Sequence, residues 1–227
     1  MSKKNFDYCP KKAAFRKECV ANPIIEIFGG PLPEDKIIVD TAGEYSKNVK
    51  ATACYQLLKT GAITSTTQFV GVDNESKSGS NGIVKTNALH YGPDCRWHIP
   101  CVCDEIQNFC LKNRDRIGFI SLDLQALAPN CFYVFESTLQ AMQGSSHKFG
   151  ICFNSIFSLP WNMKENLIKN GLVEEAMETE FQRYQEDNYS FVNLLQNYNP
   201  MSWFWYEGCG KSQTILGSLV FERKLPL

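Results

Sequence analysis

Short apolar runs that end on an acidic residue recur in the first half of the chain. They are Ile37–Asp40, Gln68–Asp73, Ile99–Asp104 and Ile117–Asp123. Each is short and contains β-branched or aromatic residues, which favours a buried strand. Segments with apolar residues at helical spacing lie between them, and this alternation predicts a parallel sheet. Because the carboxyl ends of parallel strands lie along one edge, we expect the four acids to line a shared crevice there.

The rest of the chain continues the alternation and then changes period. Lys148–Asn154 predicts a fifth strand, and residues 162–184 predict a long helix that is interrupted near Gly171. Two apolar runs flank a glycine-rich loop between Trp203 and Phe221. This arrangement predicts an antiparallel hairpin that closes the sheet.

We expect one large domain with an N-terminal addition. With 227 residues, of which 44% are hydrophobic, the chain can bury a sizeable core. Gly and Pro cluster at residues 29–33, which marks a boundary after a helix expected around residues 11–21. The predicted units are an arm and helix over residues 1–35 and one α/β domain over residues 36–227.

The charge distribution bears on the kind of ligand. A formal net charge of -1 and a pI near 6.3 indicate no general attraction to nucleic acid or to an anionic membrane. Carboxylates along the strand ends suit a ligand with hydroxyls, amines or a cationic centre, and they repel a phosphate-rich one. Six basic residues near the N-terminus are expected to form a solvated, partly mobile arm, or alternatively a contact for a polyanion that lengthens a substrate groove: Lys3, Lys4, Lys11, Lys12, Arg16 and Lys17.

Cysteine usage indicates a reducing compartment. The ten cysteines are dispersed, and the polar start lacks the apolar segment of a secretory signal, so we expect reduced thiols in a cytoplasmic protein. Cys101 and Cys103 have no second closely spaced pair, and no metal site is expected. No apolar run approaches the ~20 residues that span a bilayer, so no membrane contact is expected.

The strand order, the acids and the closing hairpin together resemble the class I methyltransferases, over about residues 36–223. The resemblance implies an α/β fold: a three-layer Rossmann-like sandwich with a mostly parallel, seven-stranded sheet and a C-terminal antiparallel hairpin. It implies S-adenosylmethionine as the cofactor. The methyl acceptor remains unassigned and is either a small molecule or a nucleic acid, and the oligomeric state is not indicated.

The resemblance also implies roles for individual residues. In that family the acid that ends the first strand and the glycines after it hold the methionine end of the cofactor. The acid that ends the second strand binds the ribose hydroxyls, because a carboxylate can accept two hydrogen bonds from a vicinal diol. The segment after the third strand contacts the adenine. The implied cofactor-binding residues are Asp40, Gly43, Glu44, Asp73, Asn74, Asp104, Glu105 and Ile106.

Asp123 and Asn154 are the catalytic candidates. They end the predicted fourth and fifth strands, where the family positions its catalytic or substrate-orienting residues. Methyl transfer is an in-line displacement that mainly requires alignment of the nucleophile with the methyl group. A base is needed only if the nucleophile carries a proton, and Asp123 could either accept that proton or orient the nucleophile.

Several features keep an alternative open. Gly43 is the only glycine in a loop where the family usually has several, and residues 124–127 lack the acid- or asparagine-Pro-Pro-aromatic motif of enzymes that methylate exocyclic base amines. The alternative is therefore a catalytically degenerate, methyltransferase-like binding or interaction protein. Each strand-end acid can also cap the next helix. Residues 208–212 end like a phosphate-binding loop, but Trp205 stands where that motif needs glycine.

Overall fold

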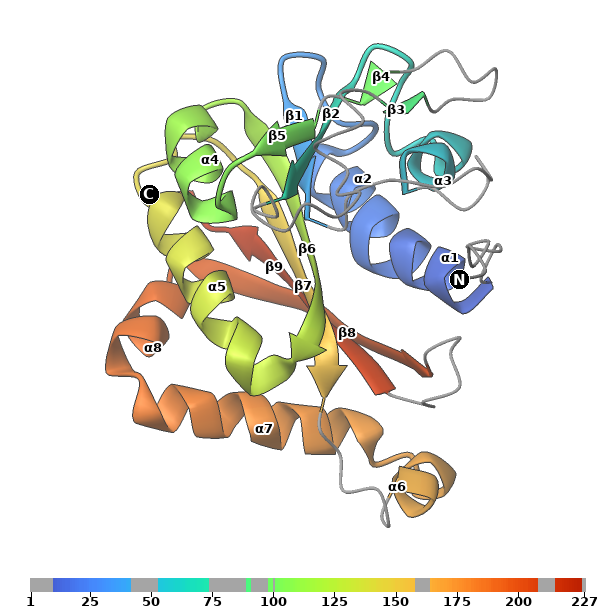
Figure 1. The fold of residues 1–227 in the computed structure, drawn as a ribbon, viewed down its shortest axis with the longest axis vertical. Helices are drawn as coiled ribbons and strands as arrows, with labels where there is room; N and C mark the ends of the chain where they lie inside the picture. The colour runs from blue at the N-terminus through green and yellow to red at the C-terminus, as the bar shows by residue number, and fades with distance from the viewer. Residues whose placement is uncertain are drawn as a thin grey trace, which may run out of the picture.

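The described part of the chain forms a mixed α/β structure around one large sheet (Figure 1). The computed structural model of the protein describes residues 10–41, 53–73, 89–90, 98–99, 101–157, 164–207 and 215–225. The strand order within these residues is β5-β2-β1-β6-β7-β9-β8. In that order the strands are Cys101–Cys103, Gln68–Asp73, Ile37–Asp40, Ile117–Leu127, Gly150–Phe157, Ile215–Arg223 and Tyr198–Glu207.

The pairing of the strands follows the alternation in the sequence. β1 is parallel to β2 and β6, β2 is parallel to β5, and β6 is parallel to β7. β9 is antiparallel to both β7 and β8, so the closing hairpin is confirmed. The mixed α/β class is therefore confirmed as well.

The expected bounds of three strands are wrong. Ile99 belongs to β4 (His98–Ile99), which pairs with β3 (Leu89–His90) in a separate two-stranded sheet. Pro100, which has no backbone N–H to donate, separates this ribbon from β5 in the sequence. In the middle of the sheet, β6 continues past Asp123, with an irregularity in its pairing with β7 after that residue. β7 begins at Gly150 rather than at Lys148 and continues past Asn154.

Side chains of consecutive strand residues enter two hydrophobic cores, one on each face of the sheet. Val39 and Ile120 lie in the core that contains helices α4, α5, α7 and α8. Ile38 and Phe119 lie in the core that contains the N-terminal helices and α3. The bounds of these helices are Ile106–Asn113 for α4, Ala128–Ala141 for α5, Val173–Asp187 for α7, Tyr189–Leu195 for α8 and Ala53–Thr60 for α3.

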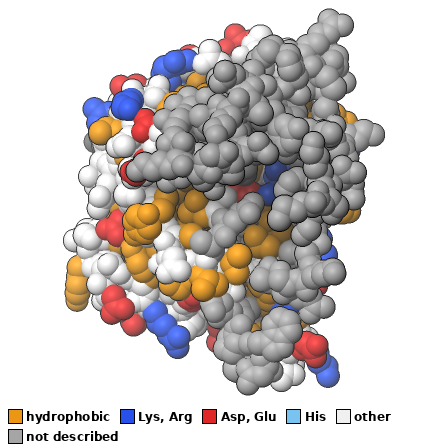
Figure 2. Space-filling view, viewed as in Figure 1, with side chains coloured by type: hydrophobic (Ala, Val, Ile, Leu, Met, Phe, Trp, Pro, Cys, Tyr) orange, Lys and Arg blue, Asp and Glu red, His pale blue; other side chains and the backbone are white. Residues whose placement is uncertain are grey.

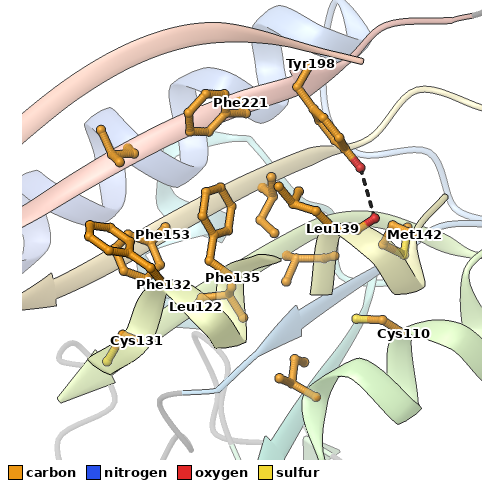
Figure 3. Close-up of a cluster of buried hydrophobic side chains, with 14 of the residues drawn as sticks. Cys110, Leu122, Cys131, Phe132, Phe135, Leu139, Met142, Phe153, Tyr198 and Phe221 are labelled. Atoms are coloured by element: carbon orange, nitrogen blue, oxygen red, sulfur yellow. Dashed lines mark hydrogen bonds between the residues drawn. The ribbon is translucent and has the colours of Figure 1, made fainter. Parts of the chain in front are cut away.

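Aromatic rings fill the first of these cores (Figure 3). Phe132 and Phe135 project from α5 onto Phe153 of β7, with ring centroids 5.3 and 5.2 Å from it. Tyr198 lies at the edge of the cluster, and its hydroxyl donates a hydrogen bond of 3.4 Å to the carbonyl of Leu139. Burial raises the pKa of Tyr198 to about 12, so this hydroxyl keeps its proton and serves as a structural donor.

The N-terminal helical segment is longer than expected and is continuous through residue 28. It consists of α1 (Pro10–Arg16), a π-helical turn η1 (Lys17–Ala21) and α2 (Asn22–Phe28). Pro23 lies in the first turn of α2, directly after the π-helical turn. Gly29, at φ 70°, ends α2 in the left-handed conformation that glycine adopts readily.

The long helix after the fifth strand is interrupted at the predicted place. Gly171, at φ 69°, separates α6 (Lys164–Asn170) from α7. The C-terminal half continues to Asp187, beyond the expected end, and is followed by α8.

Three further properties concern partners and environment. Hydrophobic side chains gather around α5 on the face drawn in Figure 2, and Leu111, Leu127 and Tyr133 are exposed large hydrophobic residues of α4, β6 and α5. None of the helices within the described ranges is both long and apolar enough to cross a membrane. Five cysteines whose side chains are described are thiols without a disulfide: Cys19, Cys54, Cys110, Cys131 and Cys152.

Candidate functional site

Three of the predicted acids lie at the ends of neighbouring strands. Asp40 ends β1 and is in register with Gly71 of β2, while Asp73 ends β2 and is in register with Cys103 of β5. Asp104 follows β5 directly. Because β1, β2 and β5 are adjacent and parallel, these positions share the carboxyl edge of the sheet.

The two acids whose side chains are described have different environments. Asp40 is buried, with 3% of its surface exposed. The Asp104 side chain is 20% exposed and accepts hydrogen bonds from Lys112 Nζ at 2.8 Å and from the backbone N–H of Glu105 at 2.9 Å. The hydrogen bond from Lys112 is the main cause that lowers the pKa of Asp104, so this carboxyl is ionised at neutral pH.

The remaining predicted cofactor residues are placed only in part. Glu105 is exposed at the start of α4 and accepts a hydrogen bond from Gln107, whereas Ile106 is buried in the core beneath α4. Gly43, Glu44 and Asn74 lie outside the described residues, and only the backbone of Asp73 is described.

Asp123 and Asn154 form a buried pair on β6 and β7. They are opposite each other in the parallel register, and Asn154 Nδ2 donates a hydrogen bond of 2.6 Å to Asp123 Oδ1. Ser218 Oγ on β9 donates to Asn154 Oδ1 at 2.8 Å, which fixes the orientation of the amide. Asp123 is 6% exposed and Asn154 is fully buried. The structure therefore brings the two catalytic candidates into direct contact.

A lysine from the N-terminal helix completes the surroundings of Asp123. Lys12 Nζ on α1 lies 2.7 Å from Asp123 Oδ2, so both carboxyl oxygens have a partner. Burial raises the pKa of Asp123, but the charges of Lys12 and Arg16 and the hydrogen bonds from Lys12 and Asn154 outweigh it, and the net shift is downward. Asp123 is thus a paired carboxylate and a poor proton acceptor at neutral pH.

Basic side chains compensate the charges of Asp104 and Asp123, which the sequence pattern did not indicate. Each of these carboxylates forms an ion pair with a lysine from a neighbouring helix. The expectation of a solvated basic arm is wrong for Arg16, which is 8% exposed, and for Lys12, whose ammonium contacts buried Asp123. The charges that the sequence pattern treats separately therefore neutralise each other in the fold.

Four residues surround the Asp123–Asn154 pair without having been predicted as its partners. Tyr206 and Ser218 were given no role in a site, and Lys12 and Arg16 were predicted only as part of the basic N-terminal arm or as a contact for a polyanion. Lys12 and Arg16 are four residues apart, a spacing that places both on one helical face. Ser218 is a polar residue inside an apolar strand, and this position could have indicated a buried hydrogen bond. The Tyr206 hydroxyl interacts with the Asn154 side chain, and burial raises the pKa of this hydroxyl. The Tyr206 ring stacks on Phe15, with the ring centroids 5.6 Å apart.

A second group of ion pairs lies beside this cluster at the end of β8. The carboxylate of Glu207 forms ion pairs with Lys11 Nζ of α1 and Lys164 Nζ of α6, each with an N–O distance of 3.3 Å. The hydrogen bond from Lys11, and after it the one from Lys164, are the main causes that lower the pKa of Glu207. Since Tyr206 precedes Glu207 in β8, both groups of charges belong to the same part of the sheet edge.

The arrangement can hold and orient ligands but offers few free reactive groups. Among the described residues, no cluster of three or more His, Cys, Asp or Glu side chains could hold a metal ion. The chain of bonds from Ser218 through Asn154 to Asp123 and Lys12 fixes the position of the lysine ammonium. The described chemistry is therefore one of positioning and charge.

Comparison with known proteins gives a likeness in fold only. No family model matches the sequence, and no curated protein matches it. A candidate hemolysin from Streptococcus thermophilus has a TM-score of 0.49 and 12% identity, over 98% of this chain and 70% of that one. TYW2 from Pyrococcus horikoshii has a TM-score of 0.48 and 8% identity, over 99% and 67%.

The solved structures that resemble this chain are mostly S-adenosylmethionine-dependent methyltransferases. One from Methanosarcina mazei has a TM-score of 0.46 and 14% identity, over 90% of this chain and 98% of that one. TYW2 from M. jannaschii was solved in complex with AdoMet. Because the TM-scores are below 0.5, the function proposed for this chain rests on its own strand order and residues.

Proposed function

We propose that the chain is an S-adenosylmethionine-dependent methyltransferase, built as a three-layer Rossmann-like sandwich on its seven-stranded sheet. The observation that carries the proposal is the placement of acids at the same edge of adjacent parallel strands β1, β2 and β5, in a sheet closed by an antiparallel hairpin. The acceptor is a small molecule or a nucleic acid. Because the five cysteines with described side chains are thiols, we place the protein in the cytoplasm.

The chemistry of these acids fits the cofactor. Asp73 would accept hydrogen bonds from the ribose hydroxyls, Asp40 with Gly43 and Glu44 would hold the methionine end, and Asp104 would bind the adenine amine. Glu105, Ile106 and Asn74 would complete the surroundings of the base and the ribose. Bound in this way, the cofactor supplies a methyl group on a sulfonium centre.

Asp123 and Asn154 would contribute alignment rather than proton transfer. Their side chains are buried and bonded to each other, and Asp123 is kept ionised by Lys12 and Arg16. A fixed array of this kind positions a nucleophile without reorganisation during the reaction. Such an array suits an acceptor that reacts without a base. The nucleophilic atom of such an acceptor is already deprotonated or has a lone pair that is free to attack.

Calorimetry with S-adenosylmethionine and with S-adenosylhomocysteine tests the cofactor assignment. We expect micromolar binding of both, weakened about 10- to 100-fold by Asp73→Ala, because hydrogen bonds to a charged group contribute about 1.5–3 kcal/mol. Asp35→Ala is the matched control, since Asp35 is 72% exposed and precedes β1 at the opposite end of the strand. Absence of binding at high micromolar ligand, in a folded protein, would reject the proposal.

A binding protein without turnover is the second candidate. It is favoured because each carboxylate oxygen of Asp123 already has a partner, Asn154 for Oδ1 and Lys12 for Oδ2. Incubation of a cell extract with the protein and radiolabelled S-adenosylmethionine separates the two candidates. An acceptor that becomes labelled only with wild-type protein supports the enzyme, whereas cofactor binding without any labelling supports the binding protein.

A further inference from the structure

An open groove lies at the corner between α7 and α8. Its volume is about 530 Å³, and it is lined by Gln182, Gln185, Glu186, Tyr189 and Val192. The side chain of Tyr189 is 83% exposed, so a ligand in the groove can reach its ring. α7 packs against α5, α8 and β8, and β8 is at the opposite end of the sheet from β5. The groove is therefore separate from the strand ends assigned to the cofactor.

The corner that forms the groove is held in place by the neighbouring helix α5. Glu136 of α5 accepts hydrogen bonds from the hydroxyl of Tyr184 on α7 at 3.1 Å and from Ser190 Oγ on α8 at 2.9 Å. Phe191 of α8 is fully buried and packs on Phe181 of α7, with the ring centroids 5.7 Å apart. These contacts fix the two helices relative to each other, so the groove is already formed before a ligand binds.

An acidic stripe on α7 leads into this groove. It consists of Glu175, Glu178, Gln182 and Glu186, which recur at intervals of three or four residues and so share one side of the helix. All four side chains are exposed, and buried Met177 lies on the opposite side. Within the described residues, none of these three glutamates forms an ion pair. The stripe is therefore negatively charged without a compensating cation.

The acids of α7 are placed where they do not stabilise the helix. Glu186 and Asp187 are in its last turn, which contains no basic residue, although the carboxyl end of a helix favours cations. Glu174 and Glu178 are four residues apart, a spacing at which like charges repel each other. A bound cation would relieve both effects, and such departures from local stability are expected where a surface has a function.

We propose that the groove and the acidic stripe dock a basic segment of a partner protein, with an arginine of that segment in the groove. The guanidinium can stack on the ring of Tyr189 and pair with the carboxylate of Glu186, while its alkyl stem contacts Val192. From Glu175 to Glu186 the helix rises about 16 Å, which an extended segment of about five residues covers. This docking surface does not depend on the function proposed above.

Peptides that differ only in the side chain at the basic positions test the proposal. The probe is a fluorescein-labelled heptapeptide of alternating glycine and arginine, and its controls have citrulline, the uncharged isostere, or lysine in place of arginine. Fluorescence anisotropy at low ionic strength follows binding to the full chain. We expect the arginine peptide to bind at least about tenfold more tightly than the citrulline peptide and about threefold more tightly than the lysine peptide, because an ammonium lacks the planar stacking group. Equal affinity of the arginine peptide and either control, or no binding at millimolar protein, overturns the proposal.

Variants locate the interaction. Tyr189→Ala and Glu186→Gln should each weaken binding of the arginine peptide about two- to fivefold, because they remove the stacking ring and the paired carboxylate. Tyr133→Ala on α5 is the matched control for Tyr189→Ala, since Tyr133 is 63% exposed. Glu26→Gln is the control for Glu186→Gln, since Glu26 is exposed on α2. All four changes are at exposed side chains and should leave the fold intact. Unchanged affinity in both groove variants, or an equal loss in their controls, overturns the proposal.

Other occupants of the groove would give different results. If spermine binds in a manner that depends on Tyr189 and the arginine peptide does not bind, the ligand is a small polyamine and the proposal is overturned. If sedimentation shows a dimer that Tyr189→Ala dissociates, this surface joins two copies of the chain, which also overturns it. All of these measurements are made without S-adenosylmethionine, so their outcome is independent of whether the chain binds that cofactor.

Discussion

Asp123 lies between a lysine of α1 and an amide of β7, and its charge depends on both neighbours. Burial alone would favour the protonated carboxyl, but Lys12, Arg16 and Asn154 together stabilise the carboxylate and lower its pKa. A carboxyl with a lowered folded-state pKa stabilises the protein fully above its unfolded value of about 3.9. This contribution is lost as the pH falls through the folded-state value.

We expect Asp123→Asn to lower the free energy of unfolding by about 3 kcal/mol at pH 7, because the variant leaves Lys12 and Arg16 without this carboxylate. Near pH 3, below the unfolded-state pKa of about 3.9, the carboxyl of the unfolded wild-type chain takes up a proton, so the difference between variant and wild type should shrink. Urea unfolding at both pH values measures this.

Asp35→Asn serves as the control for Asp123→Asn, because Asp35 is 72% exposed and should change stability by less than about 0.5 kcal/mol. An identical difference between Asp123→Asn and wild type at pH 7 and pH 3 would show that the ion pair does not stabilise the fold.

At the scale of elements, the contact between α2 and β7 depends on a glycine. Gly150 begins β7, and a Cβ atom there would lie 2.6 Å from Phe119 Cε2 and 2.7 Å from Ile27 Cδ1. Both neighbours are buried in the second core, where side chains have little room to move. The close approach of helix and strand therefore requires a residue without a side chain.

Gly150→Ala is expected to destabilise the protein by about 1–3 kcal/mol, the usual effect of overpacking a core. Thermal unfolding followed by circular dichroism measures it. Gly30→Ala is the matched control, because no atom lies within 4 Å of the added Cβ and its backbone is not left-handed. Equal melting temperatures for the two variants would mean that α2 can shift away from β7 at little cost.

At the scale of the whole molecule, the N-terminal helices and the sheet share one core. Phe15, Val20, Ile24 and Ile27 are buried in the same cluster as Ile38 and Phe119 of the sheet. Ile38, Phe119 and Cys152 make part of the face of β1, β6 and β7 beneath them apolar, and this part needs the helices to be kept from water. Residues 10–28 are in this respect part of the fold around the sheet.

Deletion of residues 1–21 should therefore abolish cooperative unfolding and expose the second core, which binding of a hydrophobic dye would detect. Phe15→Ala in the full chain is a graded comparison and should cost about 3–5 kcal/mol, because it removes a buried ring. A truncated protein that melts within about 2 °C of the full chain would show that the sheet folds without these helices.

Much of the architecture followed from local pattern. Alternation of apolar runs with helical spacing predicted the parallel strands, and the two runs around a glycine-rich loop predicted the β8–β9 hairpin, because strand and helix periods are properties of nearby residues. The break at Gly171 was predictable for the same reason, since glycine adopts a positive φ without strain. The π-helical turn of η1 was not predicted, since local propensity does not distinguish it from an α-helix.

The sequence by itself determined that Asp40, Asp73 and Asp104 follow apolar runs of a parallel sheet, because strand period and alternation with helices are local patterns. The tertiary structure made their strands neighbours. Only the tertiary structure decided what surrounds Asp123. Lys12 and Ser218 are distant from it along the chain, and their contacts with the Asp123–Asn154 pair arise when α1 and β9 pack against the sheet. Contacts between distant residues depend on how elements pack, and no local pattern of residues encodes them.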